Sequence, residues 1–187
     1  MNRFRKSVIY FIGLLLAVIC VITFQKNLHK DNKVVLAKGV LEITLNAPDT
    51  RIAGIYESMF SQMQNSNPSG SGIQSISEEE PKSKLTQYLG SAVNDHFIDS
   101  CLANNDPMGL QYYCILNQIT SQADSIEVVK TKEKNQYSYD AVLRITDNAT
   151  ETMVHVNGMV LFDDEGKIDQ ITLQGRELEM LYQSSGS

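Results

Sequence analysis

The stretch SIEVVKTKEKNQYSYDAVLRITDNATETMVHVNGMVLFDDEGKIDQITL, residues 125–173, decides the fold. It contains four segments that alternate between apolar and polar residues or run apolar, and that are rich in β-branched and aromatic side chains: 125–134, 137–146, 152–162 and 167–173. The gaps between them are short, and Glu165-Gly166 is the clearest turn signal. Because parallel neighbours need long crossover connections, these gaps predict a four-stranded antiparallel meander.

Upstream of the meander, apolar residues recur at helical spacing. Pro48, Asp49 and Thr50 form a helix-start signal, followed by the apolar stripe Ile52, Ile55, Tyr56, Met59, Phe60 and Met63. A second helix is expected to start near Pro81, which follows the acidic residues 78–80. A third helix is expected to be capped by Ser91. The order of helices before strands predicts an α+β domain, with the helices covering one face of a curved sheet.

Three other segments are less regular. Residues 34–46 (VVLAKGVLEITLN) are β-prone and fit either a short strand or a stalk. Residues 64–77 are rich in Asn, Ser, Gly and Gln, which predicts a mobile loop. The segment that begins at Asp106-Pro107 fits either a fourth helix or a buried irregular stretch.

An uncharged run of eighteen residues, 7–24 (SVIYFIGLLLAVICVITF), follows the basic residues Arg3, Arg5 and Lys6. As a helix it would span about 27 Å, close to the hydrocarbon thickness of a bilayer. An uncleaved anchor is favoured over a secretory signal, because the first small-residue cleavage site, at Ala37, lies well beyond the apolar run. The predicted layout is a cytoplasmic head (1–6), a transmembrane anchor (7–24), a juxtamembrane stalk (25–46), an extracytoplasmic domain (47–182) and a disordered tail (183–187).

Charge separates the two parts of the chain. Residues 1–33 contain six Lys or Arg and one Asp, a net charge of +5, whereas the remainder carries −11. An acidic domain is repelled by phosphate backbones, so nucleic-acid binding is excluded. The basic flank of the apolar run should instead lie against lipid headgroups, which makes the membrane itself the first predicted partner.

The cysteine and histidine content limits the chemistry of the domain. Outside the cytoplasm, Cys101 and Cys114, thirteen residues apart, fit a disulfide, but each also fits a buried apolar position, and the sequence leaves both alternatives open. With only three histidines and no Cys-x-x-Cys pair, no zinc site is expected. No cofactor motif is present either.

The meander ends in Phe162-Asp163-Asp164-Glu165-Gly166-Lys167-Ile168-Asp169-Gln170-Ile171, an aromatic residue, an acidic turn and Gly-Lys-Ile. With the preceding helices, over residues 47–182, this pattern resembles the nuclear transport factor 2-like superfamily, whose fold is a cystatin-like cone. The resemblance implies that a pocket, where one exists, lies inside the cone. The residues placed there by type are Tyr112, Tyr113, Asp140, Met153 and Phe162.

Enzymes of that superfamily, such as ketosteroid isomerase-like ones, use an Asp base with a Tyr or His inside the cone. Asp140, Asp95, His96 and His155 are the candidates by residue type. However, strand alternation places His155 opposite Val154 and Val156, and therefore in solvent. Asp95 and His96 are adjacent on a helix, so their side chains diverge.

The resemblance also covers membrane-anchored assembly factors of conjugative and type IV secretion machines. It therefore implies a non-catalytic domain that contacts other envelope proteins, with a homo-oligomer left open. Two alternatives remain. One is a domain that captures a small apolar ligand in the cone, and the other is an isomerase or dehydratase, which would need Asp140 or Asp95 within reach of a tyrosine.

Overall fold

A computed structural model of the chain describes residues 31–65, 79–103, 108–176 and 178. The chain divides into two units, Met1–Val35 and Leu36–Ser187, and the fold described below is that of the second. The predicted anchor (7–24), nearly all of the predicted loop (64–77) and the tail (183–187) lie outside the described residues. Within the described ranges, the structure contains no helix with the length and apolar character needed to cross a membrane.

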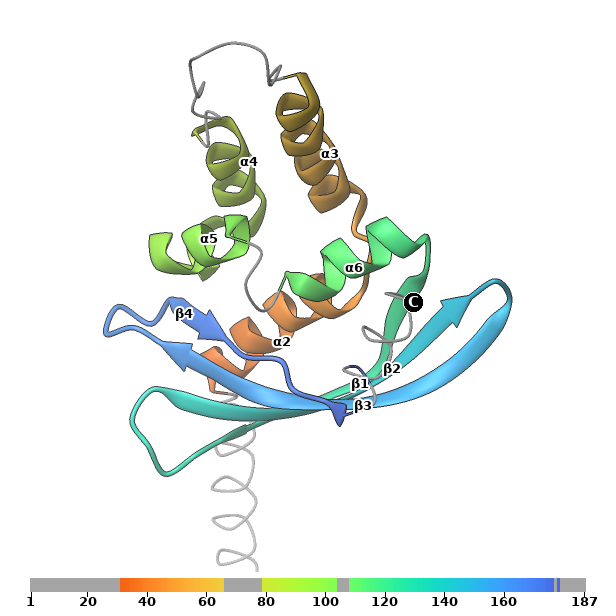
Figure 1. The fold of residues 1–187 in the computed structure, drawn as a ribbon. Coiled ribbons are helices and arrows are strands. Elements are labelled where there is room, and N and C mark those ends of the chain that lie inside the picture. The colour runs from red at the N-terminus through yellow and green to blue at the C-terminus, as the bar shows by residue number, and fades with distance from the viewer. Residues whose placement is uncertain (1–30, 66–78, 104–107, 177, 179–187) are drawn as a thin grey trace, which may run out of the picture. The chain divides into compact units, whose positions relative to one another are not determined.

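The predicted antiparallel meander is confirmed. Four strands follow one another in the order β1-β2-β3-β4 and pair antiparallel throughout, as Figure 1 shows. Their bounds are β1 Thr120–Lys130, β2 Gln136–Asp147, β3 Thr150–Phe162 and β4 Ile168–Ile171. The positive backbone φ angles of Asn135, Asn148 and Gly166 fall in the three connections, where tight turns require them.

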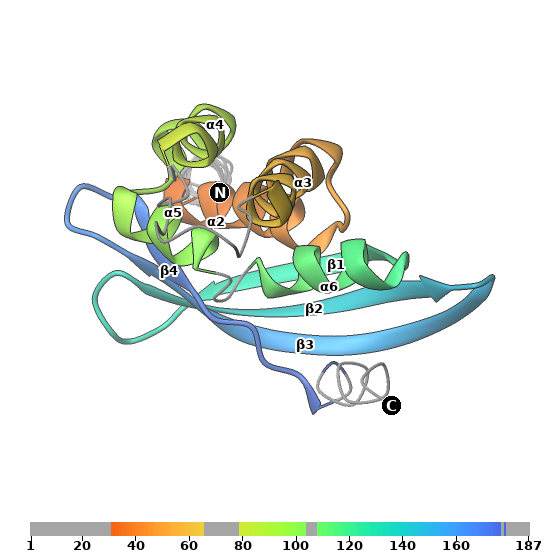
Figure 2. The same ribbon diagram turned by 45° about the horizontal axis from the view of Figure 1, so that its top comes forward.

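Five α-helices lie on the concave face of the sheet in the two views of Figures 1 and 2. Their bounds are α2 Asn32–Leu45, α3 Thr50–Asn65, α4 Glu79–Leu89, α5 Asp95–Leu102 and α6 Gly109–Asn117. The predicted α+β class, with helices packed on an antiparallel sheet, is therefore confirmed for the described residues. Of the two alternatives for the segment after Pro107, the helix is the one found.

The core lies between this face and the helices. Every second residue of β2 points inward, and these side chains are at most 3% exposed: Tyr137, Tyr139, Ala141, Leu143 and Ile145. From β3 they meet Val154, Val156 and Val160, each at most 2% exposed. Phe97 and Ile98 of α5 and Leu110 of α6 close the core from the helical side.

The helix starts follow local capping chemistry. Asp49 caps α3, because its Oδ1 accepts the N–H groups of Arg51 (2.9 Å) and Ile52 (3.3 Å). The predicted start of α3 is therefore confirmed. Helix α5 is capped by Asn94 and not by Ser91, because Ser91 lies within a separate 3₁₀ turn, η1 (Gly90–Ala92).

The prediction of a strand or a stalk over residues 34–46 is wrong, because helix α2 covers this segment up to Leu45. Its buried residues Ala37, Val40, Leu41 and Leu45 are at most 3% exposed and recur at spacings of three and four. The segment is rich in β-branched residues, but burial of this face in the core outweighs that local preference.

Both edges of the sheet are partly covered. On the β1 edge, Ala47 and Ser121 exchange two backbone hydrogen bonds (2.9 and 2.7 Å), and the Asn46 side chain accepts the N–H of Ala123 (2.8 Å). A β-bulge follows directly, between Ala123 and Ser125. On the β4 edge, the N–H of Asn94 donates to the Ile168 carbonyl (3.0 Å).

Gln111 of α6 is a fully buried polar residue that joins three helices. Its Oε1 accepts the N–H of Asp49 at 2.8 Å. Its Nε2 donates to the carbonyl oxygens of Ile43 (2.8 Å), Asn46 (3.0 Å) and Thr44 (3.3 Å). Since the last carbonyls of a helix have no partner within it, this one side chain satisfies the end of α2 and the entry to α3 together.

The segment after β4 crosses close to β3 at Gly158. Thr172 donates its N–H to the Met159 carbonyl (3.0 Å), and its own carbonyl accepts the hydroxyl of Tyr139 (2.8 Å). A Cβ at Gly158 would lie 1.9 Å from that same carbonyl oxygen. Gly158 is therefore required by close approach of the backbone.

Candidate functional site

The structure does not bring the five predicted pocket residues together. Asp140 is exposed and Met153 is 46% exposed, both on the outer face of the sheet. The reason is strand alternation, because their neighbours Tyr139 and Val154 point into the core. Placing Asp140 and Met153 inside the cone was therefore wrong.

The other three residues of that set are on the helical side but contribute to packing. Phe162 is 5% exposed, and its ring meets the Tyr137 ring edge-on, with centroids 5.3 Å apart. Tyr112 and Tyr113 are half-buried on α6, and the Tyr112 ring lies 6.1 Å from that of Tyr56. The rings of Phe162 and Tyr112 therefore pack against rings of other elements.

The candidate acid–base residues are also placed clearly. His155 is exposed on the outer face of β3, as alternation predicts. Asp95 and His96 are both exposed at the start of α5, and His96 Nδ1 lies 3.2 Å from Asp169 Oδ1. The partner of His96 therefore comes from β4 and is not the adjacent Asp95.

A groove of about 590 Å³ runs along this end of the domain, and we call it the α5 groove. It is formed by the end of α4, the turn η1, the start of α5 and the turn between β3 and β4. Its lining residues are Thr86, Gly90, Ser91, Val93, Asn94, Asp95, His96, Asp163, Glu165 and Lys167. Carboxylates outnumber cations among them, so the groove is acidic overall.

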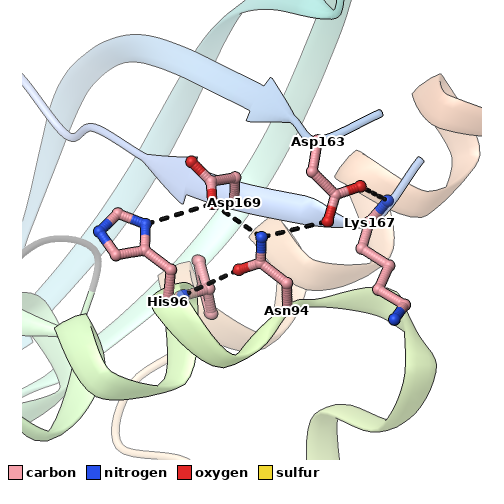
Figure 3. Close-up of polar contacts among 6 residues, drawn as sticks. Asn94, His96, Asp163, Lys167 and Asp169 are labelled. Atoms are coloured by element: carbon pink, nitrogen blue, oxygen red, sulfur yellow. Dashed lines mark hydrogen bonds and ion pairs between the residues drawn. The ribbon is translucent and has the colours of Figure 1, made fainter. Parts of the chain in front are cut away.

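Asn94 organises the floor of the groove (Figure 3). Its Oδ1 accepts the N–H of Phe97 (3.0 Å) and so caps α5. Its Nδ2 donates to Asp169 Oδ1 (2.7 Å) and to Asp163 Oδ2 (3.1 Å), two carboxylates on either side of the turn. One amide thus fixes the helix start against the turn between the strands.

Asp163 is held by several donors. Its Oδ1 accepts the backbone N–H of Lys167 (2.9 Å), while its Oδ2 accepts from Asn94. These bonds favour the ionised form, and the N–H of Lys167 contributes most to lowering the pKa of Asp163 from its ordinary value. Beside it, Lys167 Nζ pairs with Glu165 Oε2 at 2.9 Å, which raises the pKa of Lys167.

The polar groups of the α5 groove include exposed side chains at the surface of the domain. The His96 side chain is 68% exposed, so water screens its contact with Asp169. In the described part of the chain, no three His, Cys, Asp or Glu side chains are arranged to hold a metal ion. What the groove does offer is fixed carboxylates and a cation at a rigid junction.

Asp163 should make the stability of the domain depend on pH. A carboxylate whose pKa is lowered by folding stabilises the folded state at any pH above its pKa in the unfolded chain, about 3.9. This contribution is lost as the pH falls from that value through the pKa of the folded state. We expect Asp163→Asn to lower the urea midpoint near neutral pH, and the difference to shrink below about pH 4. Urea titrations at both pH values test this, with Asp140→Asn as the exposed control. A difference that does not change with pH would contradict the prediction.

Cys101 and Cys114 are free thiols in the structure, and both are fully buried. Burial raises the pKa of each thiol to about 12. Because the thiolate is the reactive form, both are inert packing groups in this state. Of the two alternatives from the sequence, the structure contains the buried thiols, and the backbone carbonyl of Cys101 also accepts the Tyr56 hydroxyl at 3.0 Å.

Asn94 is the residue of the groove that sequence reasoning missed, although Asp95 and His96 beside it were candidates. Asn94 directly precedes a helix and is a favoured capping residue, so its capping role had a local signal. Its contacts with Asp163 and Asp169 span 69 and 75 residues, and no local pattern contains them.

Comparison with known proteins adds little. No family model and no curated protein matches the chain. Among solved structures, the crystal structure of a protein described as a "putative polyketide cyclase", from Xanthomonas campestris pv. campestris, is 12% identical. The alignment covers 71% of this chain and 96% of that one, with a TM-score of 0.36. A likeness at this score carries no inference about family or chemistry.

Proposed function

We propose that this chain is a non-catalytic interaction component: a membrane-anchored, extracytoplasmic domain of the nuclear transport factor 2-like kind that contacts other proteins of a cell-envelope or conjugation-type assembly. The anchor is proposed from the apolar run 7–24 and its basic flanks. The fold family is proposed from the order of helices and meander. Neither residues 1–30 nor a partner is described by the structure.

The observation that carries the non-catalytic part is the burial of large side chains on the inner face of the sheet. Tyr137, Tyr139 and Leu143 of β2 are at most 2% exposed beneath the helices, and Phe97 is fully buried. An isomerase or an apolar-ligand domain of this superfamily would use that space, and Asp140, the base expected there, is on the other side of the sheet. We therefore look for the functional residues on the surface of the domain.

The α5 groove is the surface feature best suited to a protein partner. The hydrogen bonds from Asn94 to Asp163 and Asp169 hold the helix and the turn on its two sides together. Binding there would therefore cost little ordering of the chain. Its rim carries Asp95 and Glu165, both exposed, which favours a partner with basic side chains.

Charge reversal at the rim tests this function. In the full chain within its native membrane, Asp95→Lys combined with Glu165→Lys should reduce the amount of chain found in a large complex by about tenfold or more, equivalent to 1.4 kcal/mol. Native-gel size after mild detergent extraction measures it. The matched control is Glu127→Lys combined with Asp140→Lys, which makes the same change of charge at two exposed positions of β1 and β2 outside the groove lining.

Two results would overturn the proposal. One is a wild-type chain that runs only at the size of its own monomer or homo-oligomer. The other is a control variant that breaks the complex as much as the rim variant does, since that would show a general charge effect and no role for the groove.

A further inference from the structure

A second hollow lies between α3 and α4, which run side by side in Figures 1 and 2. Its volume is about 390 Å³, within the range of small-molecule sites. It is lined by Arg51, Ile55, Lys84, Gln87 and Tyr88, and we call it the α3–α4 pocket. Two of these five residues are cations, whereas residues 34–187 as a whole carry a net charge of −11.

The Arg51 side chain is exposed, and its guanidinium lies over the Tyr88 ring. The guanidinium carbon lies 4.8 Å from the centroid of the Tyr88 ring, which is a cation–π contact. A guanidinium carries its N–H donors in its plane, where they match the two oxygens of a carboxylate. Within the described ranges, no carboxylate lies within 4.0 Å of the Arg51 guanidinium nitrogens.

Tyr88 is itself held in place. Its hydroxyl donates to Asp49 Oδ2 at 2.7 Å, and the other oxygen of Asp49 accepts the backbone N–H groups of Arg51 and Ile52. Burial, together with this hydrogen bond to Asp49, raises the pKa of Tyr88 to about 12, so the hydroxyl stays neutral and keeps donating. Asp49 therefore caps α3 and also positions the Tyr88 ring, over which the Arg51 guanidinium lies.

The rest of the pocket provides a second cation and an apolar wall. Lys84 lies one helical turn before Tyr88 and pairs with Glu80 at 2.7 Å, with both side chains about half exposed. Such a surface pair contributes little, so Lys84 can turn to another anion at small cost. Ile55 is 5% exposed, and with the Tyr88 ring it forms an apolar wall.

We propose that the α3–α4 pocket binds a small organic carboxylate with an apolar or aromatic body. The carboxylate would lie on the edge of the Arg51 guanidinium with Lys84 nearby, and the body would lie against Tyr88 and Ile55. The volume, the guanidinium over the Tyr88 ring and the apolar wall together favour this class over a hydrated inorganic anion. The proposal does not depend on the role of the α5 groove, which lies elsewhere on the domain.

Benzoate is the probe, and benzamide is its neutral analogue of nearly equal shape. With the full chain in detergent micelles, saturation-transfer NMR should give a dissociation constant for benzoate of about 1 mM or below. Benzamide should bind at least tenfold more weakly. Inorganic phosphate at an equal concentration should leave most of the benzoate bound.

Arg51→Ala should weaken benzoate binding by about tenfold or more, because a charge-assisted bidentate contact is lost. Arg51→Lys, which keeps the charge but not the planar fork, should also weaken it, and Lys84→Gln should have a smaller effect. The matched control is Arg144→Ala, which removes a guanidinium that pairs with Asp124 on the outer face of the sheet. It should leave binding unchanged.

Several outcomes would overturn the proposal. They are an absence of benzoate binding by the wild-type chain, equal binding of benzoate and benzamide, displacement of benzoate by phosphate, and a dissociation constant unaffected by Arg51→Lys and Lys84→Gln. These last two variants keep the test decisive even where Arg51→Ala fails to fold.

Discussion

Replacing Gln111 with leucine is expected to lower the free energy of unfolding by about 3 kcal/mol or more. The side chain is fully buried and makes four hydrogen bonds to backbone groups of α2, the α2–α3 connection and the cap of α3. Leucine fits the space but makes none of them. The N–H of Asp49 and the carbonyls at the end of α2, which are partly or fully buried, would then lose this partner.

Urea unfolding of the full chain in detergent, followed by near-ultraviolet circular dichroism, measures this loss. Gln122→Leu is the control, because Gln122 is an exposed residue of β1, where the same exchange should change stability by only a few tenths of a kcal/mol. A Gln111→Leu chain that unfolds at the wild-type urea concentration would show that water or a shifted backbone replaces the lost partners.

The second large effect is expected for Gly158→Ala. The added Cβ would lie 1.9 Å from the Thr172 carbonyl oxygen and 2.8 Å from Cε1 of Tyr139. Because one of these atoms belongs to the backbone, a side-chain rotation cannot relieve the overlap. The crossing segment must move away from β3, and the hydrogen bond from Tyr139 to Thr172 is lost with it, so we expect a cost of about 3 kcal/mol.

Thermal unfolding of the same chain measures this cost, and another glycine provides a matched control. Gly39 lies in α2, and a Cβ added there would meet no atom of the described residues within 4 Å, apart from its own stretch of helix. Gly39→Ala should therefore stabilise the protein by about 0.5–1 kcal/mol, since alanine is the better helix former. Equal effects of the two substitutions would mean that the close approach at Gly158 does not exist in solution.

The sheet could be predicted from the sequence because its information is local. Alternation within each strand identifies the buried face, and short turns such as the one at Glu165-Gly166 leave only antiparallel neighbours. The same alternation correctly placed His155 in solvent. Applied to Asp140 and Met153, it would have excluded them from the interior as well, because Tyr139 and Val154 are the inward residues.

Helix α2 could not be identified in this way. Its residues have strand preferences, and what makes it a helix is the fit of Ala37, Leu41 and Leu45 into the core of the domain. The spacing of these three residues can be seen in the sequence. However, the choice between a helix and a strand depends on packing partners that are distant in sequence.

The two surface sites depend on long-range contacts of the same kind. Tyr88 meets Asp49 across 39 residues, and Asn94 meets Asp169 across 75. Residue type alone does not predict either surface site, because Asn, Tyr and Arg are common on any protein surface. Only the folded arrangement reveals that their polar groups converge.

The coverage of the two sheet edges has a consequence for how the protein behaves when crowded. Open edges invite strand-by-strand polymerisation into cross-β aggregates. Here residues 46 and 47 form hydrogen bonds with the first part of the β1 edge, and Asn94 forms one with Ile168 on the β4 edge. The β-bulge beside Asp124 also disrupts the regular pairing pattern of β1. The stretch of β1 that remains carries Glu127 and Lys130, charges that disfavour stacking of identical copies. We therefore expect any self-association of this domain to proceed through side chains and not through added strands.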